Sequence, residues 1–308
     1  MYRRRSRLLA LMLPLAIATA ASGVIIASGD GSGNVTAPGS DPGWHNVGLS
    51  NASGLSAVYL GNGWVLSANH VGPGDVWFDG LLYPAIPGVS VQLSNPDTSL
   101  ADLVLFRIAE PLPALPALSI RTTPPPLTTS LILIGNGRDR GAATNWDPPG
   151  PGPTYNGWFW GAGATKRWGT NFVEDIDVEL YEPSFGTQLF GSEFDQSGPG
   201  HSTHEAQGAV GDSGGAVFAW NGSSYELAGI LIGILSYAEQ PDETALYTNA
   251  TVAADLSVYR NEIVDWMPEP SGAGWAGAAL VAALARVRRR RINAPSSPGS
   301  RRTSDRAR

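Results

Sequence analysis

The chain has 308 residues, of which 43% are apolar and 15% charged, which excludes a protein that is disordered throughout. Of its 20 basic residues, 13 lie within residues 1–20 and 267–308, so residues 21–266 keep 7 basic residues against 25 acidic ones. A body this acidic repels phosphate backbones, which excludes nucleic-acid binding. Cysteine is absent, so no disulfide braces the fold.

The first 20 residues have the pattern of a secretory signal peptide. Four arginines lie within residues 1–7, an apolar run of about a dozen residues follows, and Ala18 and Ala20 frame a cleavage site. We therefore expect export. A membrane anchor is the alternative, because the apolar character continues weakly over residues 24–27, and the pair Arg4 and Arg5 leaves the twin-arginine route open.

Residues 21–41 are rich in Gly, Ser and Pro, which predicts a linker or a flexible mature N-terminus ahead of one domain over residues 42–266. Short runs rich in β-branched and aromatic residues follow the linker. They cover residues 55–60, 64–66, 89–93 and 103–108. Helical spacing is nearly absent before residue 255, so the pattern predicts an all-β barrel fold.

Two polar residues lie next to these runs. His70 ends the segment Trp-Val-Leu-Ser-Ala-Asn-His, and Asp102 begins the segment Asp-Leu-Val-Leu-Phe-Arg-Ile. Histidine is the most common general base, and it needs a third group to hold its ring in one tautomer. For each residue alone, the alternatives are a structural histidine at a strand end and an aspartate that caps a strand.

The middle of the chain offers no cofactor site. Residues 146–160 are rich in Pro and Gly, which predicts a long loop, and residues 161–166 lack the spacing of a phosphate-binding loop, so we assign them to structure. His201 and His204 form a single pair without a third ligand in a polar loop. We therefore predict no metal and no cofactor.

Residues 211–215 read Gly-Asp-Ser-Gly-Gly, and a serine between glycines is typical of a catalytic nucleophile. The pentapeptide fits the nucleophile elbow of α/β-hydrolases, but that fold needs its acid and its histidine after the serine. The four histidines of this chain all precede Ser213, at positions 45, 70, 201 and 204. The remaining catalytic order is His70, Asp102, Ser213, and the plain alternative is a serine in a glycine-rich turn.

Three segments together resemble the trypsin-like (chymotrypsin-fold) serine peptidases. They are residues 61–70, 102–108 and 211–215, which occur in the order of that family and span the body of the chain. The resemblance implies an all-β fold of two six-stranded antiparallel β-barrels with a short C-terminal helix.

The resemblance also implies the roles of the site residues. Ser213 would be the nucleophile, His70 the general base and then acid, and Asp102 the group that orients His70. The backbone N–H groups of Gly211 and Ser213 would form the oxyanion hole. Family members that are activated by cleavage pair the aspartate before the serine with a freed N-terminus, but no Ile-Val-Gly-Gly start occurs here, so the partner of Asp212 stays open.

Substrate preference is expected near three further residues. The base of the family's primary pocket lies six residues before the nucleophile, which is Gln207 here, so a carboxylate that selects Arg or Lys is absent. The strand that pairs with substrate lies within residues 227–237. It aligns either at residues 232–234 or at Ser236 and Tyr237, and the second alignment, which we prefer, keeps the serine–aromatic pair usual in the family.

The end of the chain combines a helix with a sorting pattern. Residues 255–266 carry apolar residues at helical spacing, which predicts a helix that packs on the core. Pro-Glu-Pro at residues 268–270, a short apolar run and an arginine cluster up to residue 291 resemble the PEP-CTERM sorting signal, which implies processing by a membrane exosortase. A plain single-span anchor is the alternative, although about 15 helical residues reach only about 22 Å of a bilayer core of about 30 Å.

We therefore divide the chain into a signal peptide (1–20), a linker (21–41), a protease domain (42–266), a sorting or transmembrane segment (267–291) and a disordered basic tail (292–308). The sequence predicts an exported monomeric serine endopeptidase of the cell envelope or the extracellular space, which acts on protein or peptide substrates and contacts the membrane through its C-terminal segment. The alternative is a catalytically inactive surface binding protein with the same fold.

Overall fold

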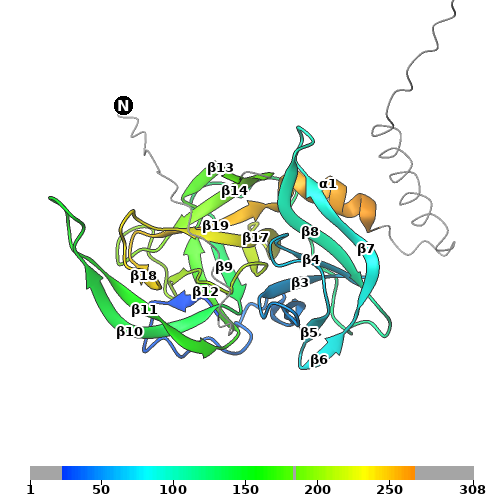
Figure 1. The fold of residues 1–308 in the computed structure, drawn as a ribbon, viewed down its shortest axis with the longest axis horizontal. Coiled ribbons are helices and arrows are strands. Elements are labelled where there is room, and N and C mark those ends of the chain that lie inside the picture. Colours follow the sequence, from blue (N-terminus) through cyan, green and yellow to red (C-terminus); the bar gives the residue numbers. More distant parts are fainter. Residues whose placement is uncertain (1–22, 183–184, 268–308) are drawn as a thin grey trace, which may run out of the picture. The chain divides into compact units, whose positions relative to one another are not determined.

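Antiparallel strands form most of the regular structure in this computed structural model, which describes residues 23–182 and 185–267. Two sheets carry the core and follow one another along the chain (Figure 1). The prediction of an all-β fold with a C-terminal helix is confirmed. Each of the two main sheets has seven described strands rather than the six that the resemblance implies.

The first sheet, drawn in blue to cyan in Figure 1, has the strand order β6-β5-β2-β3-β4-β8-β7. Its strands are β2 (Val47–Ser50), β3 (Ser56–Gly61), β4 (Trp64–Ser67), β5 (Val76–Phe78), β6 (Leu81–Tyr83), β7 (Ala85–Ser94) and β8 (Leu100–Ile108). The four apolar runs predicted from the sequence lie in β3, β4, β7 and β8. β3 and β4 are buried along their whole length, as expected for strands inside a barrel wall.

The second sheet has the order β12-β9-β16-β17-β19-β14-β13. Its strands are β9 (Ser130–Gly135), β12 (Arg167–Phe172), β13 (Asp175–Glu182), β14 (Phe185–Glu193), β16 (Ala216–Trp220), β17 (Tyr225–Leu235) and β19 (Ala250–Asp255). The register of β17 against β19 shifts between Leu231 and Gly233, which is a β-bulge. β16 begins directly after residues 211–215, so the central strands of this sheet support the serine.

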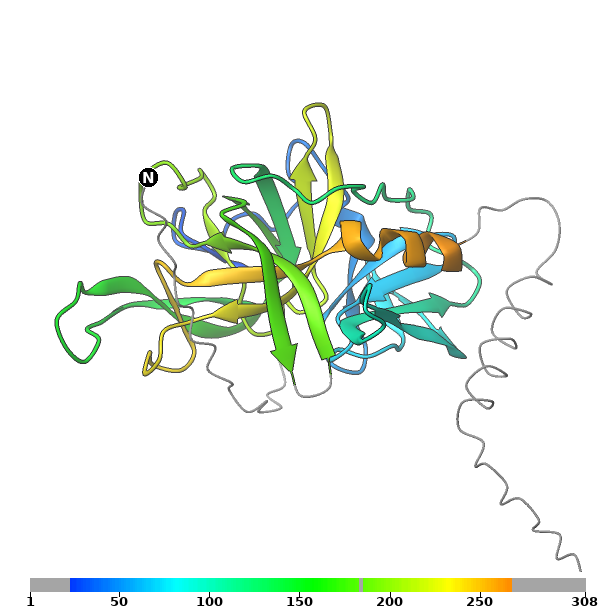
Figure 2. The same ribbon diagram turned by 90° about the horizontal axis from the view of Figure 1, so that it is seen from above.

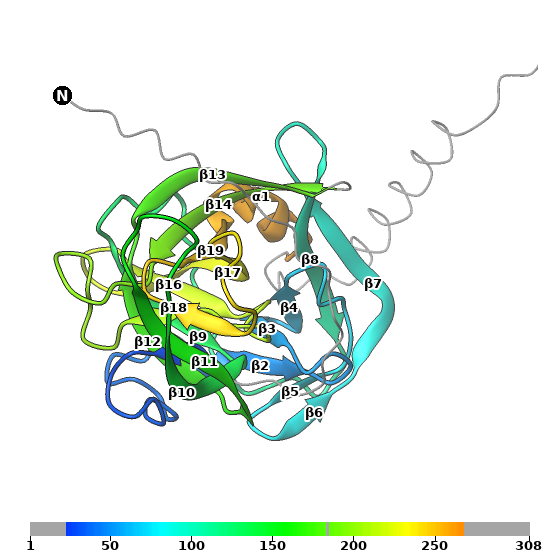
Figure 3. The ribbon, with the colours of Figure 1, turned by 60° about the vertical axis from the view of Figure 1, so that its left-hand side comes forward.

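A third sheet of three strands corrects one prediction. β10 (Arg138–Trp146) and β11 (Tyr155–Ala164) form a long hairpin, and β11 pairs with β18 (Thr244–Leu246) (Figure 3). Trp146 and residues 155–160, which were predicted as part of a loop, therefore belong to strands. The physical reason is the pairing of Trp146 with Tyr155, whose rings stack 6.0 Å apart and leave only residues 147–154 for the Pro/Gly turn.

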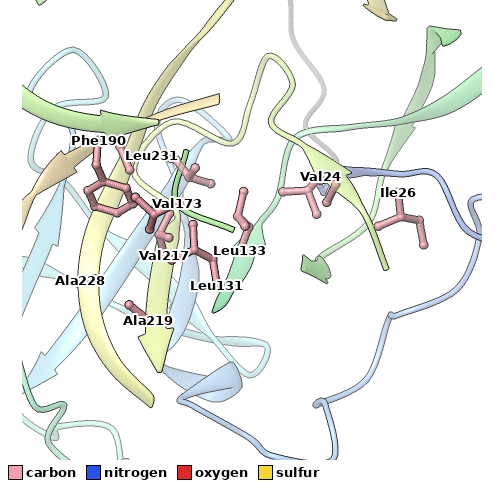
Figure 4. Close-up of a cluster of buried hydrophobic side chains, with 12 residues drawn as sticks. Val24, Ile26, Leu131, Leu133, Val173, Phe190, Val217, Ala219, Ala228 and Leu231 are labelled. Carbon is pink, nitrogen blue, oxygen red and sulfur yellow. The ribbon is translucent and has the colours of Figure 1, made fainter. Parts of the chain in front are cut away.

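The start of the segment predicted as a linker belongs to the core instead, whereas most of residues 29–41 are exposed. β1 (Ile25–Ile26) pairs with β15 (Ala206–Gln207), and Val24, Ile25 and Ile26 are at most 1% exposed. We call residues 23–36 the N-terminal arm. Figure 4 shows Val24 and Ile26 in one apolar cluster with residues of the second sheet such as Leu133. Apolar side chains outweigh the surrounding Gly and Ser here because their burial is worth about 1.5–3 kcal/mol each.

Two helical elements complete the described residues. The 3-10 helix η1 (Trp44–Asn46) leads into β2, and α1 (Leu256–Trp266) follows β19 (Figure 2). The predicted helix is confirmed. Tyr259 is buried and donates its hydroxyl to Asn95 at 2.6 Å, which attaches the helix to the first sheet. Among the described residues, none belongs to a helix long and apolar enough to cross a bilayer.

Candidate active site

His70 and Asp102 are brought together by the pairing of β4 with β8. Ser67, the last residue of β4, lies opposite Val104, so the turn after β4 reaches the start of the buried part of β8. The Nδ1 atom of His70 lies 2.6 Å from Oδ2 of Asp102, and the backbone N–H of His70 donates to Oδ1 at 2.9 Å. A carboxylate can only accept, so Nδ1 donates and Nε2 keeps the free lone pair of the neutral ring.

Burial separates the roles of these two side chains. The side chain of Asp102 is 3% exposed, whereas that of His70 is 26% exposed. The backbone N–H of Asp102 donates to Oγ1 of Thr187 in β14 at 2.9 Å, which links the pair to the second sheet. This geometry fixes one edge of the imidazole and leaves the other edge open to a reacting group.

The residues around the serine, 209–215, form what we call the nucleophile loop. Ser213 is partly exposed, while its neighbours Asp212 and Gly214 are buried. The carbonyl of Ser213 accepts the N–H of Ser56 at 2.9 Å. A Cβ on Gly214 would collide with the carbonyl of Ser56 and with Oγ of Ser67, so the loop is pressed against the end of β4, three residues before His70.

Backbone hydrogen bonds also attach the loop to the second sheet. Leu231 in β17 accepts the N–H of Gly214 and donates its own N–H to Gly215, both at 2.8 Å. Gly214 has φ +80°, a conformation that side chains disfavour, and the collision with the first sheet excludes a side chain as well. The glycine after the serine is therefore required on two independent grounds.

The loop leaves two N–H groups unused. Within the described part of the chain, the N–H groups of Gly211 and Ser213 donate no hydrogen bond, whereas those of Asp212, Gly214 and Gly215 each do. Gly211 has φ +103°, which only glycine adopts readily. Two free donors beside a nucleophile can stabilise the negative charge that develops on a carbonyl oxygen during acyl transfer.

The partner of Asp212, left open by the sequence, is the backbone. One carboxylate oxygen accepts the N–H of Gly137 at 2.8 Å and the other accepts the N–H of Ala209 at 2.7 Å. A Cβ on Gly135 would collide with this carboxylate, so that glycine makes room for it. Burial raises the pKa of Asp212 to about 8, although the Ala209 hydrogen bond and the charge of Arg167 act in the opposite direction.

The predicted specificity residues separate into two places. Gln207 is fully buried in β15, and neither its amide nitrogen nor its amide oxygen has a hydrogen-bond partner among the described residues. Ser236 and Tyr237 lie beyond the end of β17 and are exposed. The Tyr237 ring packs 4.7 Å from that of Tyr155 in the hairpin, and its hydroxyl lies 2.7 Å from Oγ1 of Thr248.

The other three histidines lie outside the site, and His45 lies 2.7 Å from Oδ1 of Asp79. His204 lies 3.3 Å from Oγ of Ser28 in the N-terminal arm, and His201 lies 3.0 Å from the carbonyl of Asp195. In the part of the chain that the structure describes, no three His, Asp or Glu side chains gather as metal ligands. Residues 161–164 end strand β11, in agreement with a structural role.

An open pocket of about 370 Å³ lies on the hairpin, apart from all the predicted site residues. Its lining consists of Ala143, Thr144, Asn145, Asn156, Gly157, Trp158, Gln196 and Tyr247. Sequence reasoning also missed the residues that support the site. Ser56, Thr187 and Gly137 carry no motif, and only their positions in the folded sheets bring them to it.

Comparisons with known proteins give a distant likeness. No protein-family model matches the sequence, and no curated protein matches it. Similar solved structures include Rv3671c from M. tuberculosis H37Rv as an inactive serine-to-alanine mutant, with 14% identity, coverage of 78% of this chain and 95% of that chain, and a TM-score of 0.46. The Rv3671c protease in an inactive form is 14% identical, with coverage of 72% and 88% and a TM-score of 0.43.

Proposed function

We propose that this protein is a serine endopeptidase that uses Ser213, His70 and Asp102. The observation that carries the proposal is the hydrogen-bonded pair of His70 and Asp102 at the end of β4, against which the nucleophile loop is also pressed. A partly exposed serine, a histidine held in one tautomer and two unused N–H groups are the parts that acyl transfer needs.

In the proposed mechanism, Oγ of Ser213 attacks the carbonyl carbon of the peptide bond while Nε2 of His70 takes its proton. His70 then gives that proton to the leaving amine as the C–N bond breaks, which leaves an acyl group on Ser213. Water then attacks this ester while Nε2 of His70 takes its proton, and His70 returns that proton to Oγ of Ser213 as the ester C–O bond breaks and the acid product leaves. Asp102 stabilises the imidazolium by accepting from Nδ1.

The N–H groups of Gly211 and Ser213 are proposed to hold the oxyanion in both steps. A donor of this kind is worth about 3 kcal/mol in the transition state, because it is already oriented when the charge develops. The buried carboxyl of Asp212 would keep the loop in shape through Gly137 and Ala209.

The substrate is proposed to be a protein or peptide whose cleaved residue is not selected for positive charge, because Gln207 is neutral. Leu231 bonds the nucleophile loop on both sides, so the residues directly after it, 232–234, are the ones next to Ser213 along β17. This supports the first of the two alignments for the strand that pairs with substrate. Ser236 and Tyr237 lie further along and would meet more distant substrate residues.

We also propose that the protein is exported and that the segment after Trp266 directs it to the envelope by exosortase processing or by anchoring. Both ends that motivate this proposal, residues 1–20 and 268–308, lie outside the described residues. The test is the membrane fraction of a chain that ends at Trp266. Unchanged membrane retention would refute any role of the tail.

A fluorophosphonate probe tests the catalytic proposal, because it reacts only with an activated serine. The folded wild type should label, Ser213→Ala should not, and Ser197→Ala, which removes an exposed loop serine, should label as the wild type does. Absence of labelling in the folded wild type would refute the protease and favour a binding protein of the same fold.

A further inference from the structure

The N-terminal arm and the nucleophile loop are held by neighbouring residues, 137–140, at the start of β10 and directly before it. We propose that Arg140 is a positioning residue that keeps the nucleophile loop in its catalytic shape by clamping the N-terminal arm beside it. This inference rests on the proposed function of Ser213 and adds a control element to it: the arm becomes a part that the catalytic site needs.

The arm pairs with the chain segment that leads into the nucleophile loop. Ile26 pairs with Ala206 and Ile25 with Gln207, and the N–H of Ala27 donates to the carbonyl of Glu205 at 2.8 Å. The nucleophile loop begins two residues after Gln207. A two-residue ladder is weak by itself, so its persistence depends on what holds the arm in place.

Arg140 supplies that hold. Its Nη1 donates to the carbonyls of Ile26 at 3.0 Å and Ala27 at 2.8 Å, and its Nη2 donates to the carbonyl of Gly29 at 2.6 Å. The planar guanidinium, which has several donors in a fixed fork, also stacks 4.6 Å over the ring of Trp158 in the hairpin. One side chain therefore fastens three carbonyls within residues 26–29 of the arm to β10.

The arm is shaped to accept this side chain. Gly31 has φ +82°, and a Cβ there would collide with Nε of Arg140. Arg167 donates to the carbonyl of Gly33 at 2.8 Å further along the arm, which follows the edge of β12. A substitution at Gly31 in the arm or at Arg140 in β10 can thus disturb the same contact.

The first residue of β10 and the residue directly before it hold the nucleophile loop as well. The N–H of Gly137 donates to Asp212 at 2.8 Å, and the N–H of Arg138 donates to the carbonyl of Val210 at 3.1 Å, directly before Gly211. A closed ring results, in which the arm pairs with β15, β15 continues into the loop, the loop bonds to β10, and Arg140 of β10 returns to the arm. Opening the ring at Arg140 releases constraints on Gly211 and leaves His70 and Asp102 untouched in the first sheet.

The ring makes a specific prediction about what Arg140 does. Val24, Ile25 and Ile26 are buried among apolar side chains and should stay so without Arg140, so the variant should fold and loosen locally. In a looser loop, the N–H groups of Gly211 and Ser213 spend less time oriented toward the oxyanion. The rate of reaction at Ser213 should therefore fall, while the affinity for the probe should change less.

The experiment compares Arg140→Ala and Gly31→Ala with Arg260→Ala, which removes an arginine of α1 whose Nε also bonds a backbone carbonyl, that of Ile120. The maximal rate constant of fluorophosphonate labelling should fall about tenfold in the first two variants with little change in the probe concentration for half-maximal rate. The double variant should be no slower than either single one, because both open the same contact. Arg140→Lys should recover part of the rate, since an ammonium also donates to carbonyls.

Hydrogen exchange gives a readout that does not need catalysis. Backbone amides of residues 205–213 should exchange faster in Arg140→Ala, while those of residues 64–70 and 100–108 should not change. Wild-type rates of labelling and exchange in both variants, or faster exchange throughout with an equal loss of Tm, would overturn the inference. If the wild type does not label but residues 205–213 still respond, the proposed function fails and the coupling of the arm to the loop stands.

Discussion

The two halves of the candidate site are held in different ways. The pair of His70 and Asp102 lies within the first sheet, where two neighbouring strands and two hydrogen bonds between the same two residues position it. The nucleophile loop is held by backbone bonds to β3, β10 and β17, which come from distant parts of the chain. Apart from the bond between Asp102 and Thr187, the first half is therefore built within one sheet, and the second half depends on how the two sheets and the hairpin assemble.

This contrast predicts that variants in the first half change chemistry without changing stability, and that variants in the second half change both. The largest effect is expected for Asp102→Asn. The amide donates where the carboxylate accepted, so the ring of His70 loses the tautomer with a free Nε2, and the rate of reaction at Ser213 should fall about 10⁴-fold. Labelling kinetics measure this, with Asp97→Asn in the exposed turn before β8 as control. A rate within tenfold of wild type would contradict the role of Asp102.

Gly214→Ala should have the next largest effect. The methyl group would push the loop away from Ser56 and Ser67 and would displace the N–H of Ser213, so we expect about a hundredfold lower rate. The left-handed backbone and the collision should also cost about 2–3 kcal/mol of unfolding free energy.

The matched control for Gly214→Ala is Gly222→Ala. Gly222 has φ +101° in the turn between β16 and β17, but a Cβ there meets nothing within 4 Å. The control should lose some stability, measured by denaturant unfolding, and keep the full labelling rate. Equal rates in the two variants would show that the loop does not depend on its fit against the first sheet.

The smallest effect is expected from pH. Burial raises the pKa of Asp212 to about 8 and that of Glu205 to about 7, so the folded protein keeps protons that the unfolded chain releases above about pH 4. The stabilisation is complete below the unfolded pKa values and is lost as the pH rises from about 4 to 8. Tm should therefore fall over this range in calorimetry, and the fall should be smaller in Asp212→Asn and Glu205→Gln.

Glu239→Gln, which removes an exposed carboxyl, should keep the wild-type slope of Tm against pH. The half-buried Lys166, whose pKa desolvation lowers to about 8, acts in the opposite direction only above about pH 8. A Tm that rises between pH 5 and 7, or variants that keep the wild-type slope, would contradict the assignment of these buried carboxyls.

Strand positions in the first sheet were predictable because buried strands with β-branched and aromatic residues have a clear pattern, as β3, β4 and β8 show. The strands of the hairpin and of the N-terminal arm were not predictable from the sequence. Residues 146–160 and 21–41 have the Gly and Pro content of loops, and only cross-strand partners such as Tyr155 for Trp146 and Gln207 for Ile25 make short parts of them strands.

For the candidate site as well, some features follow from the sequence and others only from the fold. The residue types, their order along the chain and the need for glycine around Ser213 follow from the sequence alone, because chemistry at a serine restricts which residues can surround it. The tertiary structure alone decided that Asp212 is held by backbone N–H groups, that Gly214 fits against Ser56 and that Arg140 fastens the arm beside the loop. These contacts join residues far apart in sequence through backbone atoms, which every residue carries. No pattern of side chains in the sequence therefore predicts them.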